Sequence, residues 1–189
     1  MYVGRPAFFI QDWSDSMGGK PIKAKKAVVA IDFDNIYSLL NQYKKDFDYA
    51  GFILEITEKL GLEMDAIRIF TPYDSYRLIP ESANALGYEI VVCQKMDSNR
   101  ANLWKREDKV DSYMFMSLRN FLEYPQVTHV VILSHDKHSI ELLSQAVMKR
   151  KKVIYFADKN KMRVELLDVI DKFNIPVYPL PSKDKQWKL

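Results

Sequence analysis

Short apolar runs that alternate with helical patterns are the feature that most constrains this chain. The first run, Ala27–Ile31, is apolar throughout. Strands that are buried on both faces of a parallel sheet have this continuous apolar character. The other strand candidates are Ala66–Phe70, Tyr88–Cys93, His129–Leu133, Lys152–Phe156 and Pro176–Tyr178. We therefore expect a mostly parallel sheet with both faces covered.

Helical patterns separate these runs. After the first strand, Ile36, Leu39, Leu40 and Tyr43 recur at helical spacing. The other helix candidates are Gly51–Leu60, Glu81–Leu86, Val110–Leu122, Ile140–Val147 and Met162–Phe173. Strands that alternate with helices form βαβ crossovers. The sequence therefore predicts an α/β fold, a Rossmann-like three-layer αβα sandwich.

We predict three parts in the chain. Residues 1–25 form a partly ordered N-terminal extension, residues 26–180 form the domain, and residues 181–189 form a basic C-terminal tail. The single cysteine, Cys93, is expected to be a small buried residue that forms no internal disulfide. No apolar run approaches the roughly 20 residues that span a bilayer. A cytoplasmic protein without a membrane partner is expected, and homodimer formation stays open.

The net charge of +3 is weak evidence for an anionic partner, but the charges are unevenly distributed. The connection from Gln94 to Asp108 mixes basic and aromatic residues, a combination suited to phosphate pairing and base stacking. Tyr73, after the second predicted strand, fits either stacking on RNA or packing within its loop. The predicted RNA-binding residues are Lys95, Arg100, Trp104, Lys105, Arg106, Lys109 and Tyr73.

Four carboxylates are expected at one edge of the sheet. Asp32 and Asp34 follow the first predicted strand, Asp136 follows the fourth, and Asp111 lies in the first turn of a helix. Ligands of such sheets bind outside the carboxyl ends of the strands. Mg²⁺ and Mn²⁺ prefer oxygen ligands, so these carboxylates are candidate metal ligands. A metal there could activate water for attack on a phosphodiester.

Each carboxylate also has a structural interpretation. Asp136 could cap the following helix, and Asp111 could stabilise its helix dipole. Asp34 is well placed to cap the first helix, which would leave Asp32 without that role. Convergence from separate segments is therefore the argument for a site.

Four segments together resemble the NYN domain, a PIN-like group of metal-dependent ribonucleases that includes the LabA-like bacterial proteins. The segments are Ala27–Tyr37, Lys109–Asp111, Val131–Asp136 and Arg150–Ile154. Asp32 and Asn35 match the Asp-x-x-Asn that usually follows the first strand in this family. Ser134 and Asp136 match part of the motif after the fourth strand. The resemblance implies a PIN-like fold and catalytic roles for Asp32, Asp111 and Asp136, with Asp34 as a further metal ligand.

The chain departs from the family pattern at two usual acidic positions. Ser117 stands where the family commonly has a further aspartate in the long helix, and His138 stands at the second aspartate of the fourth-strand motif. His135 replaces a glycine there. His135 and His138 could bind a softer metal or contact phosphate. We count Asn35, Ser134, His138 and Ser117 as supporting residues.

Three hypotheses of function follow. The leading one is a ribonuclease that uses Mg²⁺ or Mn²⁺ to cleave single-stranded RNA. The alternative is an NYN-like domain that has lost catalysis and binds RNA or a protein partner. A third is a phosphatase of the haloacid dehalogenase type, because Ile31–Asp34 resembles the nucleophile motif of that family. That reading lacks the paired aspartates expected after Phe156.

Overall fold

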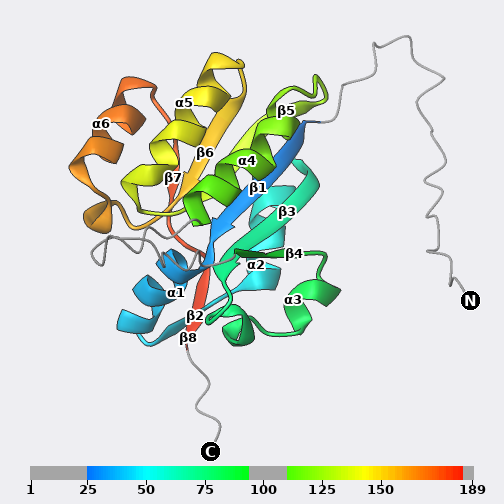
Figure 1. Ribbon diagram of the computed structural model, residues 1–189, viewed down its shortest axis with the longest axis vertical. Helices are drawn as coiled ribbons and strands as arrows, with labels where there is room; N and C mark the ends of the chain where they lie inside the picture. Colours follow the sequence, from blue (N-terminus) through cyan, green and yellow to red (C-terminus); the bar gives the residue numbers. More distant parts are fainter. Residues whose placement is uncertain (1–24, 94–109, 185–189) are drawn as a thin grey trace, which may run out of the picture.

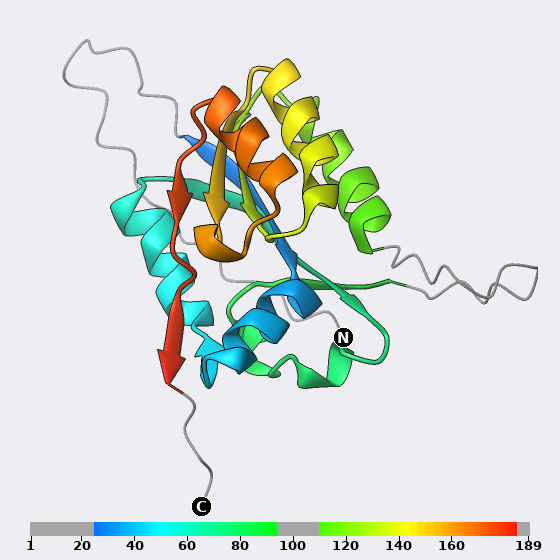
Figure 2. The ribbon, with the colours of Figure 1, turned by 90° about the vertical axis from the view of Figure 1, so that its left-hand side faces the viewer.

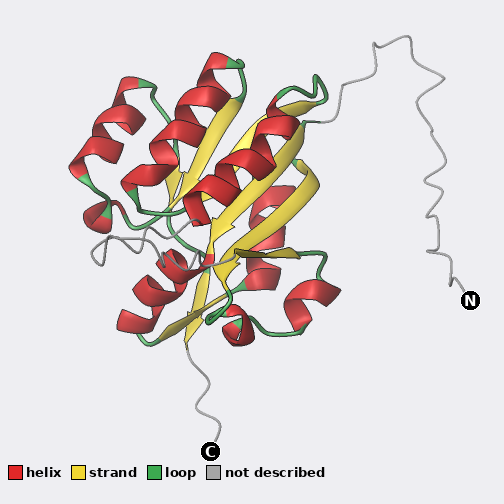
Figure 3. Ribbon diagram, in the orientation of Figure 1, coloured by secondary structure: helices red, strands yellow, loops and turns green. Residues whose placement is uncertain are grey.

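The computed structural model describes residues 25–93 and 110–184. A six-stranded sheet, in the order β4-β3-β1-β5-β6-β7, lies between two layers of helices (Figures 1 and 3). All neighbouring strands in it are parallel. The strands are β1 (Lys26–Asp32), β3 (Glu63–Pro72), β4 (Glu89–Cys93), β5 (Val127–Leu133), β6 (Lys152–Phe156) and β7 (Val177–Tyr178). The predicted fold class is confirmed.

The helices cover the sheet on both faces. The α-helices are α1 (Phe33–Gln42), α2 (Tyr49–Leu54), α3 (Ser82–Ala85), α4 (Val110–Leu122), α5 (Ile140–Met148) and α6 (Val164–Lys172). A π-helical segment, η2 (Glu55–Lys59), continues α2, and 3₁₀ turns occur at η3 (Tyr76–Leu78), η4 (Lys137–Ser139) and η5 (Lys159–Lys161). Figure 2 shows α4 and α5 on one side of the strands and α2 on the other.

Alternating residues of the strands feed two separate cores. On one face, Val28 and Ala30 of β1 pack with Met114 and Leu118 of α4 and with buried residues of α5 and α6. On the other face, the intervening residues of β1 pack with buried residues of α1, α2 and α3. Successive side chains of a strand point to opposite faces, so a strand that is apolar throughout fits this double burial.

A second, two-stranded sheet was not predicted. β2 (Lys45–Phe47) pairs antiparallel with β8 (Ser182–Asp184). Residues 182–184, which the sequence placed in the C-terminal tail, thus form a strand beside the connection between α1 and α2. No helix in the described ranges is both long and apolar enough to cross a membrane.

Candidate active site

The order of the strands fixes where a site can form. β1 lies between β3 and β5 in the sheet. From β1 the chain continues to β3 on one side, and it reaches β5 on the other side of β1 only later, after α4. The boundary between β1 and β5 is therefore the topological switch point, where loops diverge and leave a crevice. Ile31 pairs with Leu133 there, so Asp32 and the segment from Ser134 begin at the same level.

Asp32 ends β1 and is buried, with only 7% of its surface exposed. It also caps α1, because its Oδ1 accepts a hydrogen bond from the backbone N–H of Asn35 at 3.4 Å. The expectation that Asp34 caps this helix is wrong. The helix begins at Phe33, directly after the strand, so Asp34 already lies in its first turn. A residue inside the first turn cannot occupy the extended N-cap position.

The carboxyl group of Asp32 lies in a negative environment. Its pKa is raised from 3.8 to about 7, first by burial and then by the nearby carboxylates of Asp111, Asp136 and Asp34. The hydrogen bond from the backbone of Asn35 acts in the opposite direction. Carboxylates from α1, α4 and the β5–α5 connection therefore act on one buried acid at the end of β1.

Cys93, at the end of β4, lies close enough to the same carboxylates for them to affect the pKa of its thiol. It is buried, as predicted. Burial raises the pKa of its thiol to about 11, and Asp32, Asp111 and Asp34 contribute in the same direction. The thiol is thus a protonated, inert neighbour of the acidic group.

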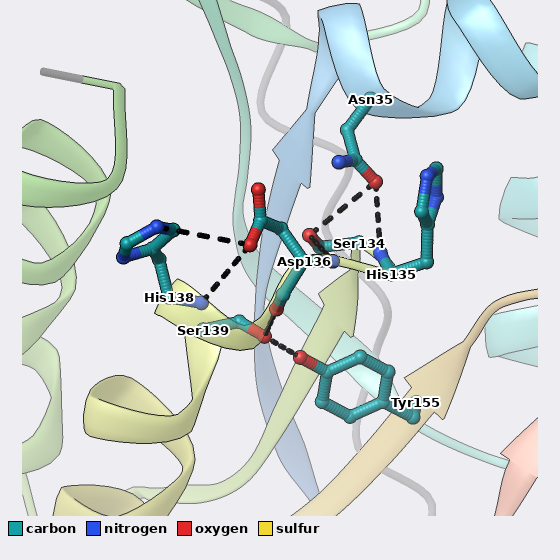
Figure 4. A network of polar contacts seen from close by, with 7 residues as sticks. All are labelled: Asn35, Ser134, His135, Asp136, His138, Ser139 and Tyr155. Carbon is teal, nitrogen blue, oxygen red and sulfur yellow. Dashed lines mark hydrogen bonds and ion pairs between the residues drawn. The ribbon is translucent and has the colours of Figure 1, made fainter. Parts of the chain in front are cut away.

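A hydrogen-bonded connector joins α1 to the end of β5 (Figure 4). The side-chain Oδ1 of Asn35 accepts from the backbone N–H of His135 at 2.8 Å and from Oγ of Ser134 at 3.5 Å. Oγ of Ser134 in turn accepts from the backbone N–H of Asp136 at 3.1 Å. Asn35 and the fully buried Ser134 therefore fix the backbone that carries Asp136.

A second set of contacts, made by Asp136 and Ser139, holds the segment that follows Ser134. Asp136 caps η4, since its Oδ1 accepts from the backbone N–H of His138 at 3.3 Å. Oγ of Ser139 donates to the carbonyl oxygen of Asp136 at 2.6 Å, and the hydroxyl of the buried Tyr155 in β6 donates to Oγ of Ser139. Figure 4 shows this chain of contacts ending beneath the carboxylate of Asp136. The capping role expected for Asp136 therefore coexists with its place in the cluster.

The two histidines take different positions. Nε2 of His138 lies 3.9 Å from Oδ1 of Asp136, and its side chain is largely exposed. The ring of His135 extends beside Asn35, away from the carboxylate of Asp136 (Figure 4). Burial lowers the pKa of His135, so its ring is neutral at physiological pH. His138 alone of the two therefore faces the acidic group.

A hollow of about 310 Å³ lies between the amino-terminal ends of α4 and α5. Asp111, His138 and Glu141 line it together with apolar side chains such as Met114 and Phe115. Sequence reasoning missed Glu141. It lies in the first turn of α5, one helical turn after His138, a spacing that places both on one face of the chain. A carboxylate is thus present close to the position where the family motif has lost one.

Ser117 lies outside this group. Its Oγ accepts from Nη1 of Arg68 in β3 at 2.6 Å. The same guanidinium bonds Glu89 through Nε at 2.8 Å and lies over the ring of Phe121. Ser117, at the position where the family commonly has an acidic residue, therefore helps to hold α4 on the sheet through Arg68.

Of the predicted RNA-binding residues, the described ranges contain Tyr73. It follows β3 and is 67% exposed, so its ring is free to stack. Lys95, Arg100, Trp104, Lys105, Arg106 and Lys109 lie outside the described residues.

The acidic group suits a hard cation by its chemistry. One carboxylate oxygen each of Asp34 and Asp111 is buried. The pKa of Asp32 is raised by burial and by neighbouring negative charge, and a bound cation would offset that charge. Within residues 25–93 and 110–184, however, no three His, Cys, Asp or Glu side chains are arranged to hold one ion. The support for a cation is therefore the donor chemistry and the charge.

Comparison with known proteins agrees with the fold. Residues 26–175 match the model of the NYN domain. A crystal structure of a protein of unknown function from Vibrio parahaemolyticus has a TM-score of 0.67 and 16% sequence identity. The match covers 85% of this chain and 96% of that chain. No match was found among curated proteins.

Proposed function

This chain belongs to the NYN domain family, and we propose that it is a metal-dependent ribonuclease that cleaves single-stranded RNA. Members of this family are typically nucleases, and NYN domains generally bind RNA. The observation that carries the proposal is the convergence of Asp32, Asp34, Asp111 and Asp136 at the switch point of the sheet, where burial and the three other carboxylates raise the pKa of Asp32. PIN-like nucleases usually use divalent metals, and Mg²⁺ or Mn²⁺ is the proposed cofactor.

Asp32, Asp111 and Asp136 would hold the cation, with Asp34 in support. The bound cation would supply positive charge for the phosphodiester and lower the pKa of a water molecule. Asn35 and Ser134 keep Asp136 in position through the contacts of Figure 4. Charged residues aimed at the reacting group before the reaction begins reduce the cost of reorganisation.

The test is cleavage of labelled single-stranded RNA with Mn²⁺, Mg²⁺ or EDTA. Wild-type protein should cut only with metal, and Asp32→Asn should reduce the rate by about 100-fold or more, the scale of losing a catalytic electrostatic group. Asp171→Asn is the matched control, because Asp171 is exposed on α6, away from the sheet edge. Equal cleavage by wild type and Asp32→Asn would overturn the proposal.

A second candidate function is RNA binding without cleavage. Two observations favour it: Ser117 is engaged with Arg68, and the described residues contain no preformed group of three metal ligands. This candidate predicts that wild-type protein retains RNA in a filter-binding assay while no metal gives turnover. Metal-dependent turnover that Asp32→Asn abolishes would eliminate it.

A further inference from the structure

A larger cavity lies on the other face of the sheet from α4. Its volume is about 500 Å³, within the range of about 300–1,000 Å³ that is typical of small-molecule sites. It is enclosed by the ends of β1 and β3, by α1, by the segment from β2 into α2, and by η3 and α3. These elements gather beyond the carboxyl ends of β1 and β3, at the lower end of the molecule in Figure 1.

The inner wall of this cavity is apolar and aromatic. Ile31 and Ile69 contribute from the sheet. Phe33 and Tyr37 of α1 stack on each other with ring centroids 5.4 Å apart and an angle of 23° between their planes. Tyr49, the first residue of α2, also lines the cavity. Flat apolar walls with aromatic rings suit a planar heteroaromatic ligand.

The polar groups of the cavity come from β2, β8 and the cap of α2. Asp46 and Lys183 are directly paired residues of the antiparallel β2–β8 ladder, and Lys45 lies beside Asp46. Asp48 lines the cavity and caps α2, since its Oδ1 accepts from the backbone N–H of Gly51 at 3.2 Å. Two acidic and two basic residues therefore line one side of a cavity whose other lining residues are mostly apolar or aromatic.

These groups select among heteroaromatic rings. A carboxylate accepts hydrogen bonds and donates none, so it binds an edge that carries adjacent N–H donors. The N1–H and exocyclic amine of guanine form such an edge. Adenine presents an acceptor nitrogen beside its amine, which a carboxylate repels. Lys45 and Lys183 add positive charge that suits a phosphate group on the same ligand.

We propose that this cavity binds a guanosine nucleotide, with the base between the aromatic wall and the Asp46 and Asp48 carboxylates and the phosphate toward Lys45 and Lys183. The nucleotide could be free or could be a guanosine within RNA, since both carry the same base and phosphate. The inference goes beyond the proposed cleavage, because the cavity lies across the sheet from Met114 and the rest of the α4 core. Binding is therefore measurable whether or not the acidic site is active.

The test is isothermal titration calorimetry of the full chain, without metal, with GMP, AMP, CMP and orthophosphate. GMP should bind at least about tenfold more tightly than AMP or CMP, the scale of a charge-assisted hydrogen bond. Orthophosphate alone should bind more weakly than GMP. Equal binding of all three nucleotides, or of GMP and orthophosphate, would overturn the proposal.

Two variants make the test specific to the cavity. Asp46→Asn should weaken GMP binding by about tenfold, while Asp171→Asn on the exposed face of α6 should not change it. Ser82→Trp places a large ring at an exposed lining position without replacing a core residue, and it should block binding if Asp46→Asn fails to fold. Unchanged GMP affinity in folded Ser82→Trp would refute this site.

A final comparison identifies the source of the ligand. A short RNA that contains one guanosine should bind more weakly to Ser82→Trp than to the wild type if the cavity serves RNA, and equally well to both proteins if the cavity serves free nucleotide. Asp32 does not line the cavity, so Asp32→Asn should bind GMP like the wild type. Loss of cleavage with GMP binding retained would therefore separate failure at the acidic site from failure at the cavity.

Discussion

Asp32 has two opposing effects on the stability of the metal-free protein. As the N-cap of α1 it stabilises the helix by accepting from Asn35, yet burial beside three other carboxylates disfavours its charge. A buried charge is tolerated when it is paired or coordinates a metal. The residue is therefore costly to stability in the absence of a cation, and that cost is a property to measure.

Replacing Asp32 with asparagine should stabilise the metal-free protein. Asparagine keeps an oxygen that can cap α1 but removes the charge. In EDTA at pH 8, urea denaturation followed by circular dichroism should give a free energy of unfolding about 4 kcal/mol higher than that of the wild type. Added Mn²⁺ should raise the melting temperature of the wild type and leave that of Asp32→Asn unchanged. A destabilised variant, or one that responds equally to Mn²⁺, would contradict this account.

The same residue gives the folded protein a specific pH dependence. The pKa of Asp32 is about 7 in the folded protein and 3.8 ordinarily, so between these values the folded state holds a proton that the unfolded chain releases. The stability contributed by the protonated side chain is complete below about pH 4 and is lost as the pH rises through 7. From pH 5 to pH 8, wild type should lose about 2 kcal/mol relative to Asp32→Asn. Parallel stability profiles for the two proteins would count against the raised pKa.

At the residue scale, the sequence predicted the approach of Asp32, Asp111 and Asp136, because the carboxyl ends of parallel strands meet at one edge. It wrongly assigned the cap of α1 to Asp34, because the helix begins two residues earlier than that assignment requires. Ser117 was counted with the site on its motif position alone. Its contact with Arg68 depends on how α4 rotates on the sheet, which periodicity does not determine.

At the scale of helices and strands, the side-chain amide of Asn35 links α1 to the segment that follows β5. Changing Asn35 to alanine leaves the backbone N–H of His135 without this acceptor. A buried donor that loses its partner costs about 1–3 kcal/mol, so the free energy of unfolding should fall by that amount. Asn84→Ala, on the exposed side of α3, is the control and should change it by less than about 0.5 kcal/mol. Equal effects of the two substitutions in urea denaturation would rule out this role for Asn35.

Elements with strong apolar patterns were predictable, and short polar ones were not. The bounds of β6 and α4 agree with the pattern of their residues. In contrast, β2 and β8 consist of the segments Lys45–Phe47 and Ser182–Asp184, which have no apolar run. Their pairing joins distant parts of the chain, so it is determined by the tertiary fold. The cavity that β2 and β8 help to form was invisible in the sequence for the same reason.

At the scale of the whole molecule, two groups of basic residues have to be compared as contacts for RNA. The Lys149–Lys152 block lies at the amino end of β6, away from the acidic edge. Lys149 pairs with Glu123, and Lys151 donates to the carbonyl oxygens of Tyr124 and Val127. These two lysines are already engaged in holding the end of α4 and the turn that follows it. The basic residues between Gln94 and Asp108 remain the predicted contacts for RNA.

Salt dependence of RNA binding distinguishes these two groups of charges. Each single-strand phosphate contact that is lost should reduce the slope of log K against log salt by about 0.7. Replacing Lys105 and Arg106 with alanine should therefore weaken binding and flatten the slope in fluorescence anisotropy with labelled single-stranded RNA. Replacing Lys149 and Lys151 removes the same charge, and it should lower stability instead, because their partners in the fold are lost. If the second pair flattens the slope more than the first, RNA follows the amino edge of the sheet, and the acidic group at the carboxyl edge is not where it is bound.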